Sequence, residues 1–162
     1  MKDAFIAELK YESVLTQKML ERVPLDKKEW KPHEKSYTLG RLATHVAEIP
    51  QWISRIITID DFDFLAHEFS RHTTDSKDEL MNIFQEKLNK AISDLETMND
   101  DDFDKTWILR SGDQVIRNMP KKVAIRGMGF SHLIHHRGQL SVYLRLLDIP
   151  VPGMYGPSAD ER

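Results

Sequence analysis

The sequence predicts an all-α protein, a four-helix bundle with a long connection before its last helix. Two observations favour this fold. Apolar residues recur at helical spacing in four stretches, and connections of unequal length join these stretches. The composition, 40% hydrophobic and 30% charged, is that of an ordinary globular protein. Because 162 residues suffice for one core, we expect a single domain over residues 1–162.

The charge and cysteine content exclude several classes of function. The net charge is -3, so nothing marks the chain as a nucleic-acid binder. It has no cysteine, which excludes disulfides, thiolate metal ligands and a cysteine nucleophile, and fits a reducing compartment. No segment resembles a signal peptide or the roughly 18 apolar residues of a membrane span. We therefore expect a cytoplasmic protein with neither a membrane nor a nucleic-acid partner.

The first two helices are predicted from their apolar residues and their ends. The first runs from Asp3 to about Arg22, and Pro24 closes it. The second runs from Thr38, its expected N-cap, to about Thr58. Pro50 lies inside this second helix, where it removes a backbone hydrogen bond and should kink the helix.

A capping box predicts the start of the third helix, which extends to about Met98. In this motif Ser76 and Glu79 satisfy each other's exposed amide groups. Asp100, Asp101 and Asp102 follow outside the helix, since acidic residues are unfavourable at a helix C-terminus. They lack the alternate spacing and the glycine of a calcium loop, so we interpret them as a solvated charge run.

The two long connections and the last helix complete the fold. Three aromatic residues in the connection before Ser76 should pack against the bundle: Phe62, Phe64 and Phe69. The segment from Lys105 to Pro120 is a long crossing loop that could form a hairpin turned at Gly112. The last helix begins at Lys121 or Lys122 and ends near Asp148. It is apolar nearly all round, so it should be central, and an extended tail should follow it along the bundle.

Three of the seven histidines lie within five residues of the predicted last helix. His132 and His136 stand one helical turn apart, so their rings project from the same face and could hold one metal ion. His135 is out of this register, and we expect it to be a partly buried packing residue. Three other histidines lie in loops and receive no role: His33, His67 and His72.

A third imidazole could come from the apolar stripe of the second helix. His45 lies in that stripe, where a single histidine is usually a core residue satisfied by its neighbours. Burying three imidazoles with unmet lone pairs would cost several kcal/mol, whereas one divalent ion meets all three. Facing helices of a bundle commonly build such sites. We therefore predict metal binding by His45, His132 and His136.

This ligand set predicts a catalytic rather than a structural metal site. No protein carboxylate completes it, so water or substrate would occupy one to three positions. Zinc or nickel suit imidazole ligands, and either would lower the pKa of a bound water or thiol. Three neighbours have two interpretations each. Glu48 could orient a ligand or be a surface charge; Gly129 could leave space above the metal or permit a close helix contact; Gln139 could bind a ligand or be a boundary polar residue.

Two segments and one histidine resemble the DinB family. The first, residues 132–140, has the sequence His-Leu-Ile-His-His-Arg-Gly-Gln-Leu, and the second, residues 151–158, has Val-Pro-Gly-Met-Tyr-Gly-Pro-Ser. His45 matches the family's first ligand position. The resemblance covers essentially the whole chain. It implies a DinB/YfiT-like bundle, often dimeric, with a divalent metal held by His45, His132 and His136.

The resemblance also suggests a reaction, because characterised relatives include metal-dependent transferases that use low-molecular-weight thiols such as bacillithiol or mycothiol. The leading hypothesis is a thiol S-transferase for detoxification or stress response, acting on a small molecule and assembled as a homodimer. Arg137 is a weaker candidate for holding a substrate carboxylate, since it points off the ligand face. One alternative is a metal-dependent hydrolase that uses bound water. Another is a non-catalytic helical module that dimerises or binds a small ligand.

Overall fold

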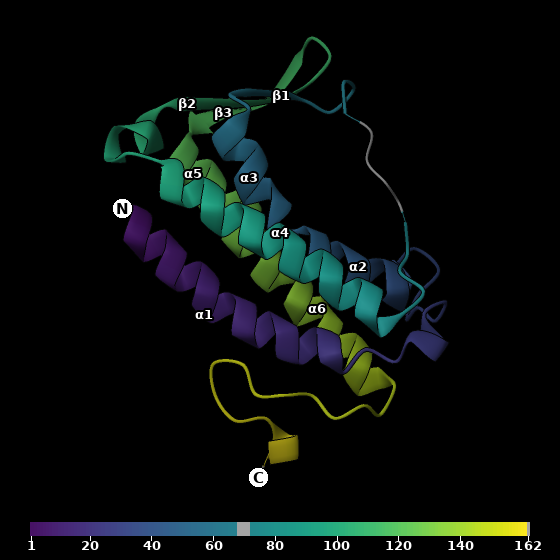
Figure 1. The fold of residues 1–162 in the computed structure, drawn as a ribbon. Helices are drawn as coiled ribbons and strands as arrows, with labels where there is room; N and C mark the ends of the chain where they lie inside the picture. Colours follow the sequence, from purple (N-terminus) through teal and green to yellow (C-terminus); the bar gives the residue numbers. More distant parts are fainter. Residues whose placement is uncertain (68–71, 162) are drawn as a thin grey trace.

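The structure, a computed structural model, describes residues 1–67 and 72–161 (Figure 1). The helices are α1 (Lys2–Glu21), α2 (Leu39–Glu48), α3 (Gln51–Thr58), α4 (Lys77–Thr97), α5 (Lys121–Ala124) and α6 (His132–Leu146). A π-helical segment, η3 (Ile125–Ser131), joins α5 to α6, and the short 3-10 helices are η1 (Leu25–Lys27), η2 (Asp100–Asp104) and η4 (Ala159–Glu161). The strands are β1 (Asp61–Asp63), β2 (Thr106–Ser111) and β3 (Gln114–Pro120).

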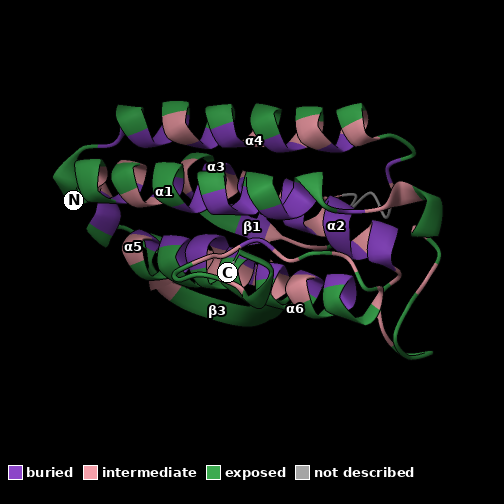
Figure 2. Ribbon diagram, turned by 90° about the horizontal axis from the view of Figure 1, so that it is seen from below, coloured by how far each residue is buried: buried purple, intermediate pink, exposed green. Residues whose placement is uncertain are grey.

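The hydrophobic core lies between the helices. The helix α4 packs against α1 and against α2 and α3, while α6 packs against α2 and α1. Figure 2 shows the buried faces of these helices turned toward one another and the exposed faces turned outward. This arrangement agrees with the predicted apolar stripes, most clearly in α4. Its buried apolar residues recur every three or four positions: Leu80, Phe84, Leu88, Ala91 and Leu95.

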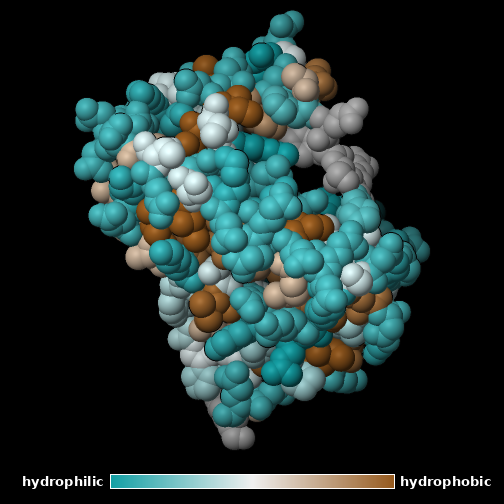
Figure 3. Space-filling view, viewed as in Figure 1, coloured by the Kyte–Doolittle hydropathy of each residue, from teal (hydrophilic) through white to brown (hydrophobic). Residues whose placement is uncertain are grey.

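The face that carries α1 and α4 is mostly hydrophilic, with separate hydrophobic side chains scattered over it (Figure 3). Among the described residues, we find no helix whose length and apolar character would let it cross a membrane.

A small sheet corrects the all-α prediction. β2 and β3 form an antiparallel hairpin, which the sequence allowed, and Gly112 adopts the positive φ (58°) that its turn requires. β1 adds to this hairpin in parallel with β2. Burial drives the pairing, because Phe62 of β1 and Trp107 and Leu109 of β2 are buried in the core. Such long-range pairing has no local sequence signal.

The predicted second helix is divided at Pro50. α2 ends at Glu48 and α3 begins at Gln51, so the expected kink is a break between two helices. Proline has no amide hydrogen for the helical hydrogen-bond ladder, which explains the position. Thr38 is the N-cap, as predicted, and its hydroxyl accepts a hydrogen bond from the Arg41 amide at 3.2 Å.

The start of α4 has only half of the predicted capping box. Ser76 Oγ accepts the Glu79 amide hydrogen at 3.1 Å, as expected. The Glu79 carboxylate, however, accepts from the Asp75 amide at 2.9 Å and lies 2.8 Å from the His72 ring. The predicted hydrogen bond from the Ser76 amide to Glu79 is therefore wrong, because Glu79 accepts from the amide of the preceding residue, Asp75.

The aspartate run lies outside α4, as predicted, but it is structured rather than simply solvated. Asp100, Asp101 and Asp102 fall in η2, which has its own capping box between Asn99 and Asp102. Asp102 pairs with Lys105 at 2.6 Å, and Asp100 pairs with the N-terminal amine at 3.0 Å.

The predicted aromatic packing of the second connection is confirmed for two of its three members. Phe62 is fully buried and Phe64 is half-buried, and their rings meet Trp52 edge-on at centroid distances of 5.4 and 5.9 Å. Phe69 lies outside the described residues.

The last helical stretch differs from a regular helix just before the predicted histidine pair. Over η3 the backbone hydrogen bonds follow the wider π pattern, and this segment ends directly before His132. A wider turn changes the angular position of His132 relative to the residues that precede η3. Helical periodicity alone therefore does not fix the direction of the His132 ring relative to α5.

Candidate metal centre

Two helices bring the three predicted histidines together. His45 comes from the second turn of α2, and His132 and His136 come from the first two turns of α6. One ligand nitrogen from each lies within 4.8 Å of the other two. In the described part of the chain, this is the one group of three or more His, Cys, Asp or Glu side chains that converges in this way.

Hydrogen bonds at the rear of two rings fix which nitrogens face the centre. Nδ1 of His136 lies 2.7 Å from Oε1 of Gln139, and Nδ1 of His132 lies 3.3 Å from the carbonyl oxygen of Met128. Both partners are acceptors, so each Nδ1 carries the proton and each Nε2 keeps a lone pair. Metal-binding histidines usually have such a rear partner, which fixes the tautomer and the ring orientation.

The spacing of the lone pairs fits a shared ion. Nε2 of His45 lies 3.2 Å from Nε2 of His132. Two imidazole nitrogens bound to one ion at about 2.0–2.1 Å stand about 2.8–3.4 Å apart for bond angles of about 90–110°. The donor set, the spacing of His45 and His132, and the tautomers of His132 and His136 are therefore compatible with a divalent metal.

The electrostatics keep the three rings neutral near pH 7. Burial, followed by the neighbouring His136 and His132, lowers the pKa of His45 to about 3. Burial and His136 lower the pKa of His132 to about 4, although the Met128 carbonyl opposes this shift. Burial also lowers the pKa of His136, with Gln139 acting in the opposite direction. Neutral imidazoles are the form that binds metals, so protons do not compete for these nitrogens at neutral pH.

A cavity opens beside the three histidines. Its volume is about 510 Å³, and both His45 and His132 line it. This volume lies within the range of small-molecule pockets, about 300–1,000 Å³. α2 and α3 supply most of its wall, and α4 adds Lys87 on another side. A ligand in this cavity would therefore have direct access to two of the three imidazoles.

The structure assigns contacts to three residues that had two interpretations each. Gln139 accepts a hydrogen bond from the His136 ring and so orients a residue that could bind the metal. Glu48 borders the cavity, where its carboxylate pairs with Arg41 at 3.2 Å. Gly129 makes a close helix contact rather than open space, because a Cβ there would lie 2.7 Å from Cγ1 of Ile53.

Arg137 is committed to a buried ion pair and does not face the histidines' cavity. It is 2% exposed, and its guanidinium lies 2.6 Å from the Glu12 carboxylate. It also donates hydrogen bonds to Thr16 at 3.0 Å and to the Tyr155 hydroxyl at 2.6 Å. The suggested contact between Arg137 and a substrate carboxylate is therefore wrong for this structure.

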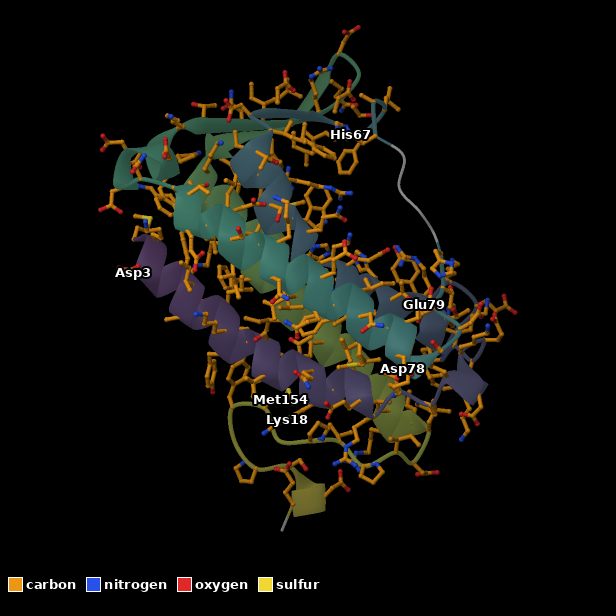
Figure 4. The ribbon with its side chains drawn as sticks, viewed as in Figure 1. Asp3, Lys18, His67, Asp78, Glu79 and Met154 are labelled. Atoms are coloured by element: carbon orange, nitrogen blue, oxygen red, sulfur yellow. The ribbon has the colours of Figure 1, made fainter. Side chains whose placement is uncertain are left out.

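The other histidines lie outside the cluster. His135 is exposed, which corrects the prediction of a partly buried packing residue; its ring meets the His136 ring edge-on, with the ring centroids 4.8 Å apart. His67 lies beside the sheet (Figure 4), where its ring stacks on Phe62 at 4.2 Å. Nδ1 of His33 accepts the Lys35 amide hydrogen at 3.1 Å.

Sequence reasoning missed the cationic residues of the cavity. Arg41 stands four residues before His45, so the helical spacing that pairs His132 with His136 also places Arg41 on the His45 face. Arg55 lies on the continuation of that face in α3. Lys87 comes from α4, and only the tertiary packing brings it to the cavity.

The fold and the cluster together define a mostly helical protein in which α2 and the last helix converge on three neutral histidines. Comparison with known proteins assigns the class: the chain belongs to the DinB family, whose pattern it matches over residues 1–162. It is 27% identical over 159 residues to the Bacillus subtilis (strain 168) protein YrdA, covering 98% of this chain and 90% of the relative.

Two solved structures share the fold. One is a DinB-like protein from Bacillus cereus ATCC 10987, with 22% identity, a TM-score of 0.74, and coverage of 94% of this chain and 97% of the other. The second is the DinB-like protein YjoA from Bacillus subtilis, with 17% identity, a TM-score of 0.69, and coverage of 91% and 95%.

Proposed function

We propose that this DinB-family protein binds one divalent metal through His45, His132 and His136 and is a metal-dependent thiol S-transferase. The observation that carries the proposal is the convergence of three neutral imidazoles, without a carboxylate ligand, beside a cavity of about 510 Å³. Nickel and zinc are the metals we favour, because both accept imidazole ligands and both bind thiolates. The role would be detoxification or stress response.

The proposed division of work follows the geometry. The metal, when bound, would lower the pKa of a coordinated thiol, so that thiolate is present at neutral pH. Gln139 would hold His136 with Nε2 toward the centre. The cavity would hold the electrophile close to His45 and His132. The thiolate sulfur would then form a bond to the electrophilic carbon, and the leaving group would depart with its electron pair.

Thiol-dependent turnover tests this reaction. Untagged protein is loaded with nickel or zinc and assayed with 1-chloro-2,4-dinitrobenzene and a panel of thiols that includes bacillithiol. The proposal expects product only when metal, thiol and protein are all present, and none above background with His45→Ala. Turnover of an ester or amide without thiol would instead favour a hydrolase. A protein that loads no metal would favour the non-catalytic module.

We further propose a cytoplasmic homodimer, as the resemblance to DinB proteins led us to expect. Exposed apolar side chains on α1 support this proposal, since Tyr11 is 54% and Val14 is 55% exposed. Light scattering coupled to size-exclusion chromatography should give twice the chain mass. A monomer at tens of micromolar protein would contradict the proposal.

A further inference from the structure

The backbone immediately before His132 does not follow the α-helical hydrogen-bond pattern. The segment η3 is π-helical, and the amide of His132, which closes it, bonds to the carbonyls of Gly127 and Gly129. In an α-helix this amide would bond to the carbonyl of Met128, four residues earlier. π-helical turns are rare and occur frequently at functional sites. Because η3 ends directly at a candidate metal ligand, its position points to a role in the histidine cluster.

The π-helical pattern leaves the Met128 carbonyl available to a side chain. Its oxygen lies 3.3 Å from Nδ1 of His132. A carbonyl oxygen can only accept a hydrogen bond, so the ring donates it and the proton lies on Nδ1. The lone pair is then on Nε2, which lies 3.2 Å from Nε2 of His45. The His132 ring thus uses the acceptor that the His132 amide would use in an α-helix.

The two histidines of α6 are supported in different ways. Nδ1 of His136 lies 2.7 Å from the side chain of Gln139, in the regular part of α6. In the interior of a regular α-helix each carbonyl already accepts a backbone amide, so a side chain is the readier partner for a ring. The His132 ring instead meets a main-chain acceptor, and it does so where the helix is wider. The wide turn therefore supplies to His132 what Gln139 supplies to His136.

Packing against α3 holds η3 in place. Ile125 and Phe130 are buried, and a Cβ at Gly129 would lie 2.7 Å from Cγ1 of Ile53 in α3. Gly127, by contrast, is exposed, with nothing within 4 Å of the position that a Cβ would take. Gly127 can therefore be replaced or removed without the direct loss of a side-chain contact.

We infer that η3 is a positioning element for His132. Its π-helical backbone leaves the Met128 carbonyl to the His132 ring, which sets the tautomer with the proton on Nδ1 and directs Nε2 toward the other histidines before a ligand binds. Metal-binding histidines are commonly oriented by such an acceptor, and its loss typically lowers metal affinity by about 10–100-fold. The role of His132 as a metal ligand rests on the proposed function, whereas its tautomer in the metal-free protein does not.

The tautomer of His132 in the metal-free protein gives the first test. Long-range proton–nitrogen correlation spectra of the full-length protein at neutral pH distinguish protonated from unprotonated ring nitrogens, and His132→Gln identifies the signals of this ring. We expect the proton on Nδ1. A proton on Nε2, the tautomer that free histidine favours in water, would overturn the inference, because the backbone would then not direct the ring.

Deletion of Gly127 tests the part played by the wide turn. With one residue fewer, the His132 amide can bond to the Met128 carbonyl as in an α-helix. The ring then loses its acceptor, so we expect the preference for the Nδ1 proton to be lost and the zinc affinity to fall by about 10–100-fold. Gly127→Ala is the matched control, since it keeps the number of residues and every backbone carbonyl, and its methyl group enters open space. It should keep both the tautomer and the wild-type zinc affinity.

The outcomes separate this inference from the proposed function. A deletion variant that is folded by circular dichroism and keeps the wild-type tautomer overturns the positioning role, as does one that binds zinc like the wild-type protein. If the deletion variant does not fold, the tautomer of the wild-type protein decides. The expected tautomer in a protein that takes up no zinc contradicts the proposed function and leaves the effect of η3 on the ring standing. Zinc uptake by a protein with the proton on Nε2 in its metal-free form gives the converse result.

Discussion

Two polar clusters lie on different faces of α6, and the consecutive residues His136 and Arg137 belong one to each. His136 belongs to the candidate metal centre, and Arg137 belongs to the buried ion pair with Glu12 and Tyr155. In the Arg137 cluster the guanidinium finds its acceptors inside the protein, and the Tyr155 hydroxyl also donates to the Glu12 carboxylate at 2.9 Å. In the histidine cluster, ring nitrogens meet each other instead, with Nε2 of His45 lying 3.2 Å from Nε2 of His132. The Arg137 cluster therefore holds parts of the fold together, whereas the histidine cluster is suited to binding a ligand.

The Arg137 cluster also holds the C-terminal tail in place. Tyr155 comes from the segment after α6, while Glu12 comes from the middle of α1. Met154, next to Tyr155, packs against the core where the tail passes below α1 (Figure 4). The tail is thus held along the helices by the hydrogen bonds of Tyr155 to the Arg137–Glu12 pair, and nearer its end Asp160 pairs with Arg145 of α6 at 2.6 Å.

The largest expected effect is on metal affinity. His136→Ala removes one of three ligands and should lower the affinity for zinc by more than about 100-fold, since even loss of a residue that only supports a ligand typically costs about 10–100-fold. Competition with a chromogenic chelator measures this affinity. His135→Ala is the matched control on the same helix and should bind zinc like the wild-type protein. An unchanged affinity of His136→Ala would remove His136 from the site.

The next largest effect is on stability and concerns the Arg137 cluster. Arg137→Ala leaves the buried Glu12 carboxylate without its partner and should lower the free energy of unfolding by about 3–5 kcal/mol. Urea denaturation of the metal-free protein measures it. Tyr155→Phe keeps the ion pair and removes one hydroxyl, so it should cost only about 1 kcal/mol. If Arg137→Ala kept full stability and lost substrate binding, the guanidinium would have a role at the active site after all.

A smaller effect on the metal site is expected from Gln139. Gln139→Ala removes the acceptor at Nδ1 of His136 and should weaken zinc binding by about 10–100-fold without abolishing it. Gln139→Glu keeps an acceptor there and should restore most of the affinity. Calorimetric titration of zinc distinguishes the two variants. Equal weakening by both would show that the hydrogen bond does not matter for binding.

The smallest effect is a pH dependence of the metal-free protein. The pKa values of His45 and His132 in the folded state, about 3 and about 4, lie below the ordinary value of 6.5. Between these values and 6.5 the unfolded state binds more protons, so stability decreases as the pH falls below 6.5. From pH 7 to 5.5 we expect a loss of about 1–2 kcal/mol, after allowance for the solvent that reaches these half-buried rings. Urea denaturation of His45→Gln should show a shallower dependence, and an equal slope would contradict the assignment.

Much of the helical fold and the identity of the three histidines could be predicted, because both depend on local spacing. The stripe of α4, the Thr38 cap and the one-turn interval between His132 and His136 are set by residues close in sequence. His45 could be added because burying three unsatisfied imidazoles is costly unless a shared ligand meets their lone pairs.

The remaining features depend on contacts between distant residues. β1 pairs with β2 although the whole of α4 lies between them in the sequence, and no local pattern predicts this pairing. Arg137 meets Glu12 from the far end of the chain, so its burial could not be told from its neighbours. The space beside Gly129 is filled by Ile53 of another helix, and Lys87 reaches the cavity from α4. Periodicity assigns a face to each such residue but does not identify what covers that face.

The metal stoichiometry of the untagged protein tests the central claim most directly. The protein is stripped with a chelator, reloaded with a small excess of zinc or nickel, desalted and submitted to elemental analysis. Three neutral imidazoles converging within 4.8 Å predict close to one metal ion per chain. They also predict almost none in the variant with His45, His132 and His136 all replaced by alanine. Well under one ion per chain in the wild-type protein, or the same content in both proteins, would contradict the claim.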